Sequence, residues 1–297
     1  MSLLDAAVCP SCRGPIARAV EPWSCTECAV SFPIDDHGIR RLAVCDDDYK
    51  RAQADFFDAR VDPEYEIVRP RGTPPFHAWL LREKFRRSVG FVSGELSGAS
   101  VLTICGGSGL DAEFLATAGA RVLCTDISPG AVRRAAVRSA RFDAGFEVAV
   151  ADAEALPFPD RAFDFVYVHD GLHHLERPVR GVAEMARVAK RGVCITEPAR
   201  ASLTRLAVRI GISTDQEEAG NVVERVTGPE LRRVLAAAGF RAQRASRYLM
   251  YYRHEPGLPA RALSAPIPGA AARAVFRAVN AVGGRVGNKL TIQAVRL

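Results

Sequence analysis

Short apolar runs alternate with helix-like stretches from residue 99 onward, and this alternation restricts the fold more than any other feature. The apolar runs read SVLTIC, RVLCTDI, FEVAVAD, FDFVYVHD and RGVCITEP. Parallel strands need a crossover between them, usually a helix, so the alternation predicts βαβ units and a parallel sheet. The runs are nearly continuous in apolar residues, which is typical of strands covered on both faces. We therefore expect an α/β domain whose sheet carries helices on both sides.

The C-terminal third predicts one more helix and two more strands. Thr227 and Glu230 belong to TGPE, a capping box that opens the helical stretch LRRVLAAAGF, and two strand-like runs follow, RYLMYY and KLTIQAVRL. The segment at about 199–225 is longer than a minimal connection. We expect it to form a substrate lid and, with the tyrosines of RYLMYY, to build an acceptor pocket.

A glycine turn follows the first strand of the alternation. The stretch VLTICGGSGLDA contains G-x-G-x-x-A, the pattern of a turn that lets a ligand approach the backbone. Asp126 ends the second strand, 19 residues after Gly107, where its carboxylate can accept the hydroxyls of a ribose. In an open α/β sheet both features meet beyond the carboxyl ends of the strands. They fit NAD and S-adenosylmethionine equally.

The segment after the third strand separates the two cofactors. It reads VADAEALPFPDRAFDFVYVHDGLHHL, with Asp152 placed to read an adenine amino group and an apolar wall at 156–158. Strand, glycine turn, acid, D-A-x-x-L-P-F, F-D and L-H-H in this order resemble class I S-adenosylmethionine-dependent methyltransferases, closest to their ubiquinone/menaquinone-type small-molecule branch. The resemblance covers about residues 99–200 and the C-terminal helix and strands. It implies a Rossmann-like sheet that binds S-adenosylmethionine.

Carried over by position, the resemblance implies a set of cofactor contacts. The glycine turn would hold the methionine part, Asp126 the ribose, Ile127 and Asp152–Ala153 the adenine, and His169 the methyl-donor end. The residues implied in the turn are Thr103, Cys105, Gly106, Gly107 and Gly109. The family usually has an acid at position 103, so the threonine weakens the expected contact with the cofactor's amino group. It usually has a glycine at position 105, so the cysteine predicts a less sharp turn.

The end of the fourth strand holds the candidates for the chemistry, His169, Asp170, His173 and His174. Methyl transfer is an in-line displacement in which the enzyme mainly aligns the reactants. A hydroxyl or carbon acceptor also needs a base, and histidine has a suitable pKa. Because His173 and His174 are neighbours, we expect only one of them to face the pocket. Asp170 could orient a histidine or bind a substrate amine. The alternative is that these histidines only line the wall.

Four cysteines near the N-terminus form two Cys-x-x-Cys pairs, CPSC and CTEC, separated by twelve residues. This spacing predicts a structural, tetrahedral Zn²⁺ site made of Cys9, Cys12, Cys25 and Cys28. Two redox dithiols or a disulfide pair are the alternatives. With F-P-I-x-x-x-G-I after the second pair, the pattern resembles zinc ribbons, including ribbons fused in front of bacterial methyltransferases.

We expect three parts: a zinc ribbon at 1–44, a linker and helical cap at 45–98, and the S-adenosylmethionine-binding domain at 99–297. Within the middle part, FHAWLLREKFRRSVGFVSGEL predicts a helix that caps the site or covers a sheet edge, whereas PEYEIVRPRGTPP predicts an irregular segment. Arg69 and His77 are candidates for the mouth of the site.

Charge and hydropathy limit the partners. The net charge is +6, but basic and acidic residues are interspersed, so nucleic acid is possible and less favoured. No apolar run approaches the about 20 residues of a membrane helix, so we expect a cytoplasmic protein without a membrane partner, in an undetermined oligomeric state. The favoured function is methyl transfer from S-adenosylmethionine to an O, N or C nucleophile of a small molecule. An rRNA methyltransferase whose ribbon binds RNA, and a non-catalytic binder of the cofactor, are the alternatives.

Overall fold

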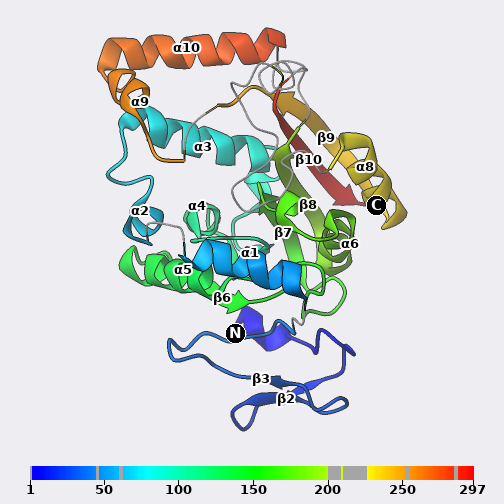
Figure 1. The fold of residues 1–297 in the computed structure, drawn as a ribbon. Coiled ribbons are helices and arrows are strands. Elements are labelled where there is room, and N and C mark those ends of the chain that lie inside the picture. Colours follow the sequence, from blue (N-terminus) through cyan, green and yellow to red (C-terminus); the bar gives the residue numbers. More distant parts are fainter. Residues whose placement is uncertain are drawn as a thin grey trace.

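The computed structural model describes residues 2–44, 47–59, 63–199, 209, 226–251, 254–283 and 287–297. In this part of the chain, a seven-stranded sheet with helices around it forms the centre, and a three-stranded sheet lies at the N-terminal end (Figure 1). Apart from Ala199 and Arg209, the predicted lid at 199–225 lies outside the described residues, and so does Tyr252 of the predicted strand RYLMYY.

Five parallel strands follow the predicted alternation. They are β4 (Ser100–Thr103), β5 (Arg121–Asp126), β6 (Glu147–Val150), β7 (Phe163–His169) and β8 (Ala189–Pro198). The strand order is β6-β5-β4-β7-β8-β10-β9, so the chain runs from β4 to β5 and β6 on one side and to β7 and β8 on the other. The order therefore reverses next to β4, which is where ligands bind in open α/β sheets.

The remaining two strands make the sheet mixed rather than fully parallel. Strand β10 (Lys289–Arg296) lies antiparallel between β8 and β9 (Phe240–Tyr248). The predicted position of the strand before β10 is wrong, because β9 ends at Tyr248, where RYLMYY was expected to continue. Pairing with β10 sets these bounds, from Phe240 opposite Arg296 to Tyr248 opposite Lys289. As an edge strand with mostly polar residues, β9 lacks the apolar run on which the prediction relied.

Helices cover both faces of the large sheet. Residues of α3 (Pro75–Val89), α4 (Leu110–Thr117) and α5 (Pro129–Arg141) share one buried cluster with Phe165 and Cys194. Residues of α6 (Pro178–Val188) and α8 (Gly228–Ala237) share another with Val166 and Ile195. The predicted capping box opens α8, since the Thr227 side chain accepts a hydrogen bond from the Glu230 amide and the Glu230 side chain accepts one from the Thr227 amide.

Two helices precede α3. They are α1 (Asp48–Ala59), which lies in the part that the sequence assigns to a linker and helical cap, and α2 (Pro63–Val68). The expectation of an irregular segment at PEYEIV is wrong. Pro63 begins the helix, and a proline is tolerated in the first turn. The acidic Glu64 in the same turn interacts favourably with the positive end of the helix dipole. Helix α2 packs against α5.

The N-terminal part contains η1 (Leu3–Ala6) and an antiparallel sheet of β1 (Ile16–Ala17), β2 (Trp23–Cys25) and β3 (Ser31–Phe32). Its Phe32 and Leu42 belong to the same buried cluster as Phe158 of the large domain. The Leu42 amide donates to the Val150 carbonyl over 2.8 Å, and the Val150 amide donates to the Arg40 carbonyl over 3.0 Å. The ribbon therefore pairs with the edge strand β6 as well as packing against the sheet.

The C-terminal segment adds α9 (Leu258–Ala262) and α10 (Pro266–Gly283), and short helical turns occur at η2 (Ser93–Glu95) and η3 (Leu172–His174). Helix α3 packs against α9, β8 and β10. Figure 1 shows α10 as the outermost layer above α3, far from the ribbon. In the described ranges, no helix has both the length and the apolar content needed to cross a membrane.

Candidate functional site

A cavity of about 300 Å³ lies at the carboxyl ends of β4, β5, β6 and β7. Most of the sequence-predicted residues line it, namely Thr103, Cys105, Gly106, Gly107, Asp126, Ile127, Asp152, Ala153, His169, Asp170 and His174. Gly109 and His173 do not. Of the two candidates for the mouth, Arg69 lines the cavity and His77 does not. The cavity thus collects residues from four strand ends, as the fold requires.

The glycine turn is as sharp at Cys105 as a glycine would make it, so the expectation of a less sharp turn is wrong. Cys105 has a φ of 49°, in the left-handed region, and Gly107 follows with a φ of 54°. A Cβ on Gly106 would lie 2.5 Å from the Cys124 Sγ and 2.8 Å from the Thr103 Oγ1, so only glycine fits there. The structure therefore keeps the turn geometry and places the strain on Cys105, at a cost of about 1 to 3 kcal/mol.

Asp126 holds this turn against the end of β5. Its Oδ2 accepts a hydrogen bond from the Gly107 amide and its Oδ1 accepts one from the Ser128 amide, both over 2.9 Å. Burial raises the pKa of Asp126, and the two amides oppose that rise. Asp126 is half-buried and lines the cavity, and a carboxylate has enough lone pairs to accept ligand hydroxyls in addition to the two amides.

Helix α1 supplies residues that the sequence analysis missed. Lys50 Nζ donates to Asp152 Oδ2 over 2.7 Å and lies 3.5 Å from Glu154 Oε2. Gln53 and Phe57 of the same helix also line the cavity. These residues reach the cavity because α1 packs against α5. The sequence of this segment, which was expected to be mainly a linker, has no periodic pattern that indicates these positions.

Two buried oxygen atoms in the cavity wall have neither a hydrogen-bond partner nor an ion pair among the described residues. Thr103 Oγ1 and Asp111 Oδ1 have no hydrogen-bond partner among the described residues, and both residues line the cavity. Asp152 and Asp170, by contrast, pair with Lys50 and Lys289. Asp111, which the sequence analysis did not single out, forms no ion pair within the described ranges. An unmade hydrogen bond at a buried carboxylate oxygen costs free energy, so this wall suits a ligand that donates N–H groups or carries positive charge.

His169 forms part of the inner wall. Its side chain is 0% exposed, and its Nδ1 lies 2.9 Å from the Ser88 Oγ on α3. Burial and the nearby Lys84 lower the pKa of His169, so the imidazole is neutral at physiological pH. The ring is held on its Nδ1 side, while its Nε2, 3.4 Å from Asp170 Oδ2, makes no hydrogen bond among the described residues, so this side of the wall can contact a ligand.

Of the two neighbouring histidines, only one lines the cavity, as expected for adjacent residues. His173 is buried, and its Nδ1 lies 2.7 Å from Glu197 Oε2, while the amides of Gly171 and Leu172 donate to the other oxygen of Glu197. His174 lines the cavity, with its Nδ1 3.2 Å from Gln53 Oε1. His173 therefore fixes the loop after β7, and His174 is the histidine that faces the cavity.

Asp170 is paired and ionised. Burial alone would raise its pKa, but Lys289, with its Nζ 2.5 and 2.6 Å from the two carboxylate oxygens, and His169 hold that pKa well below its usual range. Burial also raises the pKa of the Cys105 thiol well above its usual value, with Asp126 adding to the effect. A carboxylate neutralised by lysine is a weak base, and a protonated thiol is a weak nucleophile, so neither side chain is prepared for covalent or base catalysis.

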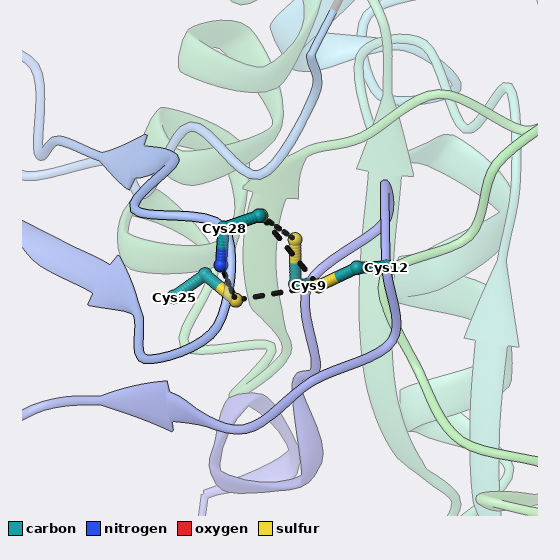
Figure 2. Close-up of side chains that lie close together, drawn as sticks. All are labelled: Cys9, Cys12, Cys25 and Cys28. Carbon is teal, nitrogen blue, oxygen red and sulfur yellow. Dashed lines mark hydrogen bonds between the residues drawn. The ribbon is translucent and has the colours of Figure 1, made fainter.

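The four N-terminal cysteines come together from two loops (Figure 2). Their sulfur atoms all lie within 4.8 Å of one another, and three of the S–S distances are 3.4 to 3.5 Å. Amides of Gly14 and Glu27 donate to the sulfurs of Cys12 and Cys25 over 3.4 Å. Zn–S bonds of about 2.3 Å place tetrahedral ligands about 3.8 Å apart, and a disulfide needs about 2.05 Å, so the spacing fits metal ligation better than disulfides.

The comparisons with known proteins agree with this geometry. Residues 102–196, about a third of the chain, match the family model described as a methyltransferase domain. Magnesium protoporphyrin IX methyltransferase from Synechocystis PCC 6803, solved with bound SAH, superposes with a TM-score of 0.55 at 19% identity, covering 84% of this chain and 100% of that chain. PH0226 protein from Pyrococcus horikoshii OT3 gives 0.52 at 15% identity, covering 80% and 97%. The large domain therefore has the Rossmann-like fold of methyltransferases.

Curated relatives are similar over about a third of the chain. A demethylmenaquinone methyltransferase of Renibacterium salmoninarum is 36% identical over 109 residues, which cover 37% of this chain and 44% of the relative. A ubiquinone/menaquinone biosynthesis C-methyltransferase of Bordetella avium is 42% identical over 98 residues, covering 32% and 38%. The chain spans less than half the length of these relatives. The similarity thus covers about a third of this chain.

Proposed function

We propose that the protein is an S-adenosylmethionine-dependent methyltransferase that modifies an O, N or C nucleophile of a small molecule. The cavity at the strand ends carries this proposal, because it joins a tight glycine turn, the ribose-type acceptor Asp126 and the unpartnered oxygen of Asp111. The match to a methyltransferase domain over residues 102–196 supports it. The similarity to quinone methyltransferases supports the choice of a small-molecule acceptor.

The residues present fit this cofactor at three points. The turn at 105–107 leaves room for a methionine moiety, and Asp111 would accept hydrogen bonds from its amino group, which compensates in part for Thr103 standing where the family has an acid. Asp126 would hold the ribose, and Ile127 with Ala153 would pack against the adenine. Lys50 of helix α1 pairs with Asp152, so a bound adenine would share the Asp152 carboxylate with Lys50. The cofactor would supply an electrophilic methyl group.

The chain's own contribution to the reaction is mainly alignment. The fixed turn, the loop held by Glu197 and His173, and helix α1 define where the two reactants meet, and such positioning can contribute about 7 to 11 kcal/mol to lowering a barrier. His174 is the residue best placed to accept a proton from an acceptor, because it faces the cavity and its ring is held by Gln53. Acceptors that need no base would bind in the same site without transferring a proton to His174.

The N-terminal cysteines are proposed to hold a structural Zn²⁺. The four thiols offer a closed tetrahedral set without an open position, which is the arrangement of structural rather than catalytic zinc. The metal would fold the short strands β1 to β3, and packing of this ribbon against Phe158 and β6 ties it to the cofactor domain. The structure thus supports an integral role for the ribbon.

Transfer of label from methyl-labelled S-adenosylmethionine tests the proposed function. The purified full chain is incubated with fractions of a cell extract that contain small molecules, proteins or RNA. We expect label in the small-molecule fraction, because the cavity is small and lies between the helices and the sheet. Label in RNA would contradict the proposal in favour of an rRNA enzyme. Cofactor binding without label in any fraction would contradict it in favour of a non-catalytic binder.

Asp126→Ala is expected to weaken S-adenosylmethionine binding by about ten- to a hundredfold. The substitution removes an acceptor for the ribose hydroxyls and frees the amides of Gly107 and Ser128 that position the turn, and hydrogen bonds to a charged group are each worth about 1.5 to 3 kcal/mol. Calorimetric titration with the cofactor measures the change, and Asp36→Ala, in an exposed turn of the ribbon, is the control. Unchanged affinity, or binding of NAD in place of S-adenosylmethionine, would overturn the assignment.

A further inference from the structure

Helix α10 presents an apolar face to the outside of the molecule. Ile267, Val275 and Val282 are 84%, 60% and 90% exposed, and Val279 is 44% exposed. At 100° per residue these four side chains lie on one face of the helix together with exposed alanines. We name this set the α10 face; it consists of Ile267, Ala270, Ala271, Ala274, Val275, Ala278, Val279, Ala281 and Val282. None of these nine residues is polar.

The opposite side of α10 is already fixed to the protein. Phe276 packs against Trp79 of α3, with ring centroids 5.2 Å apart. Asn280 accepts a hydrogen bond from the Leu249 amide over 2.7 Å and donates one to the Leu249 carbonyl over 3.1 Å. The helix is thus oriented by its inner side while its outer side stays apolar. An exposed apolar helix face of this extent is typical of an interaction site.

The charged residues of α9 and α10 all have one sign. The two helices contain no aspartate or glutamate, and they contain three arginines, Arg261, Arg273 and Arg277. Arg277 on α10 and Arg261 on α9 are exposed beside the apolar face. An apolar face flanked by arginines is the composition that lies in the interface of a bilayer, with apolar side chains among the acyl chains and cations at anionic headgroups.

We propose that the α10 face docks on the surface of a membrane that contains anionic lipids. A second copy of the chain is the alternative occupant of the α10 face. Pairing two such faces would bring their arginines together, and the face contains no carboxylate that could form ion pairs with them. Anionic lipid headgroups supply the missing negative charge. This departs from the sequence-based expectation of no membrane partner, which considered only membrane-crossing segments.

The segment before α9 borders the cavity. His254 lines the cavity, and the Tyr65 hydroxyl donates to its carbonyl over 2.6 Å. Four residues later α9 begins at Leu258, which is 80% exposed. The docking itself does not depend on the proposed methyl transfer, because it involves neither the glycine turn nor Asp126.

Sedimentation of the full chain with lipid vesicles tests the proposal. We expect binding to vesicles of phosphatidylcholine with phosphatidylglycerol, and binding at least about fivefold weaker to phosphatidylcholine alone, because each arginine near an anionic surface contributes measurably. Val275→Asp is expected to weaken binding by about tenfold or more, since it removes an inserted apolar side chain and adds a like charge. Arg261→Gln with Arg277→Gln is expected to abolish the preference for the anionic vesicles.

Val137→Asp is the matched control. Val137 is an exposed valine on α5, 44% exposed and far from α10 in the fold, so this variant should bind vesicles as the unmodified chain does. Failure of the unmodified chain to sediment with either vesicle would overturn the proposal, as would equal loss of binding in Val137→Asp and Val275→Asp. A concentration-dependent dimer that Val275→Asp dissociates, without vesicle binding, would assign the face to a second copy instead. Circular dichroism verifies that the variants are folded.

Discussion

Cys9→Ser is expected to abolish binding of the proposed Zn²⁺ and unfold the N-terminal ribbon, lowering the free energy of unfolding by about 4 kcal/mol or more, as loss of a metal site can do. Cys9 is fully buried, and its sulfur lies 3.5 Å from that of Cys28. The strands β1 and β3 have two residues each, too few to hold together without the crosslink that a metal provides. Treatment of the unmodified chain with a strong chelator should have the same effect.

The loss should extend to the cofactor site. The ribbon pairs with β6 through Leu42 and Val150, and the Val8 amide donates to the Pro157 carbonyl over 2.9 Å. These contacts flank Asp152, which lies between them in the chain and lines the cavity. Unfolding the ribbon would free both ends of this wall. We therefore expect weaker binding of S-adenosylmethionine along with faster amide exchange in residues 9–42 and 150–157.

Metal analysis, hydrogen exchange and cofactor titration measure these effects together. Cys194→Ala is the control, because Cys194 is a buried cysteine of β8 outside the four-sulfur cluster. It should retain one equivalent of zinc and unmodified exchange in the ribbon. A Cys9→Ser variant, or a chelated chain, that keeps full protection in residues 9–42 would contradict a metal-dependent ribbon.

The parallel half of the sheet could be predicted because each of its strands is a local apolar run. β5 and β7 carry their own signal within six or seven residues, and burial on both faces leaves few polar positions to obscure it. β9 could not be found in this way. It is an edge strand whose sequence FRAQRASRY contains three arginines, so its existence depends on pairing with β10, more than forty residues later in the chain.

The same distinction holds within the site. The glycine turn and Asp126 stand directly at strand ends, where the chain order alone indicates which residues meet. Lys50, Glu66 and His254 reach the cavity from segments whose packing is set by tertiary contacts, and no spacing in the sequence connects them to it. Even Cys105, recognised as a departure from the family, was misjudged, because the surrounding contacts hold it in a left-handed conformation that its own preference disfavours.

Arg138 is the clearest case of a residue that only the structure explains, and Arg138→Met is expected to lower the free energy of unfolding by about 3 to 5 kcal/mol. A basic residue in the last turn of a helix ordinarily lies in solvent near the negative end of the helix dipole. Arg138 is instead 0% exposed. Its guanidinium donates to the carbonyls of Ser108 and Arg69 and to Glu113 Oε2, each over 2.8 Å, and to the Glu66 carbonyl.

Methionine fills a similar volume but donates no hydrogen bond, so Arg138→Met leaves three buried carbonyl groups unsatisfied, while Glu113 keeps Arg71 as a partner. Because Ser108 belongs to the glycine turn and Glu66 and Arg69 line the cavity, cofactor affinity should fall together with stability. Arg141→Met is the matched control from the same helix. Its pair with Glu64 is solvent-exposed, at 42% and 64%, and should contribute less than about 1 kcal/mol. Denaturant unfolding and cofactor titration of both variants measure the difference. If Arg138→Met proves no more destabilising than Arg141→Met, the buried guanidinium does not organise the three segments around the cavity.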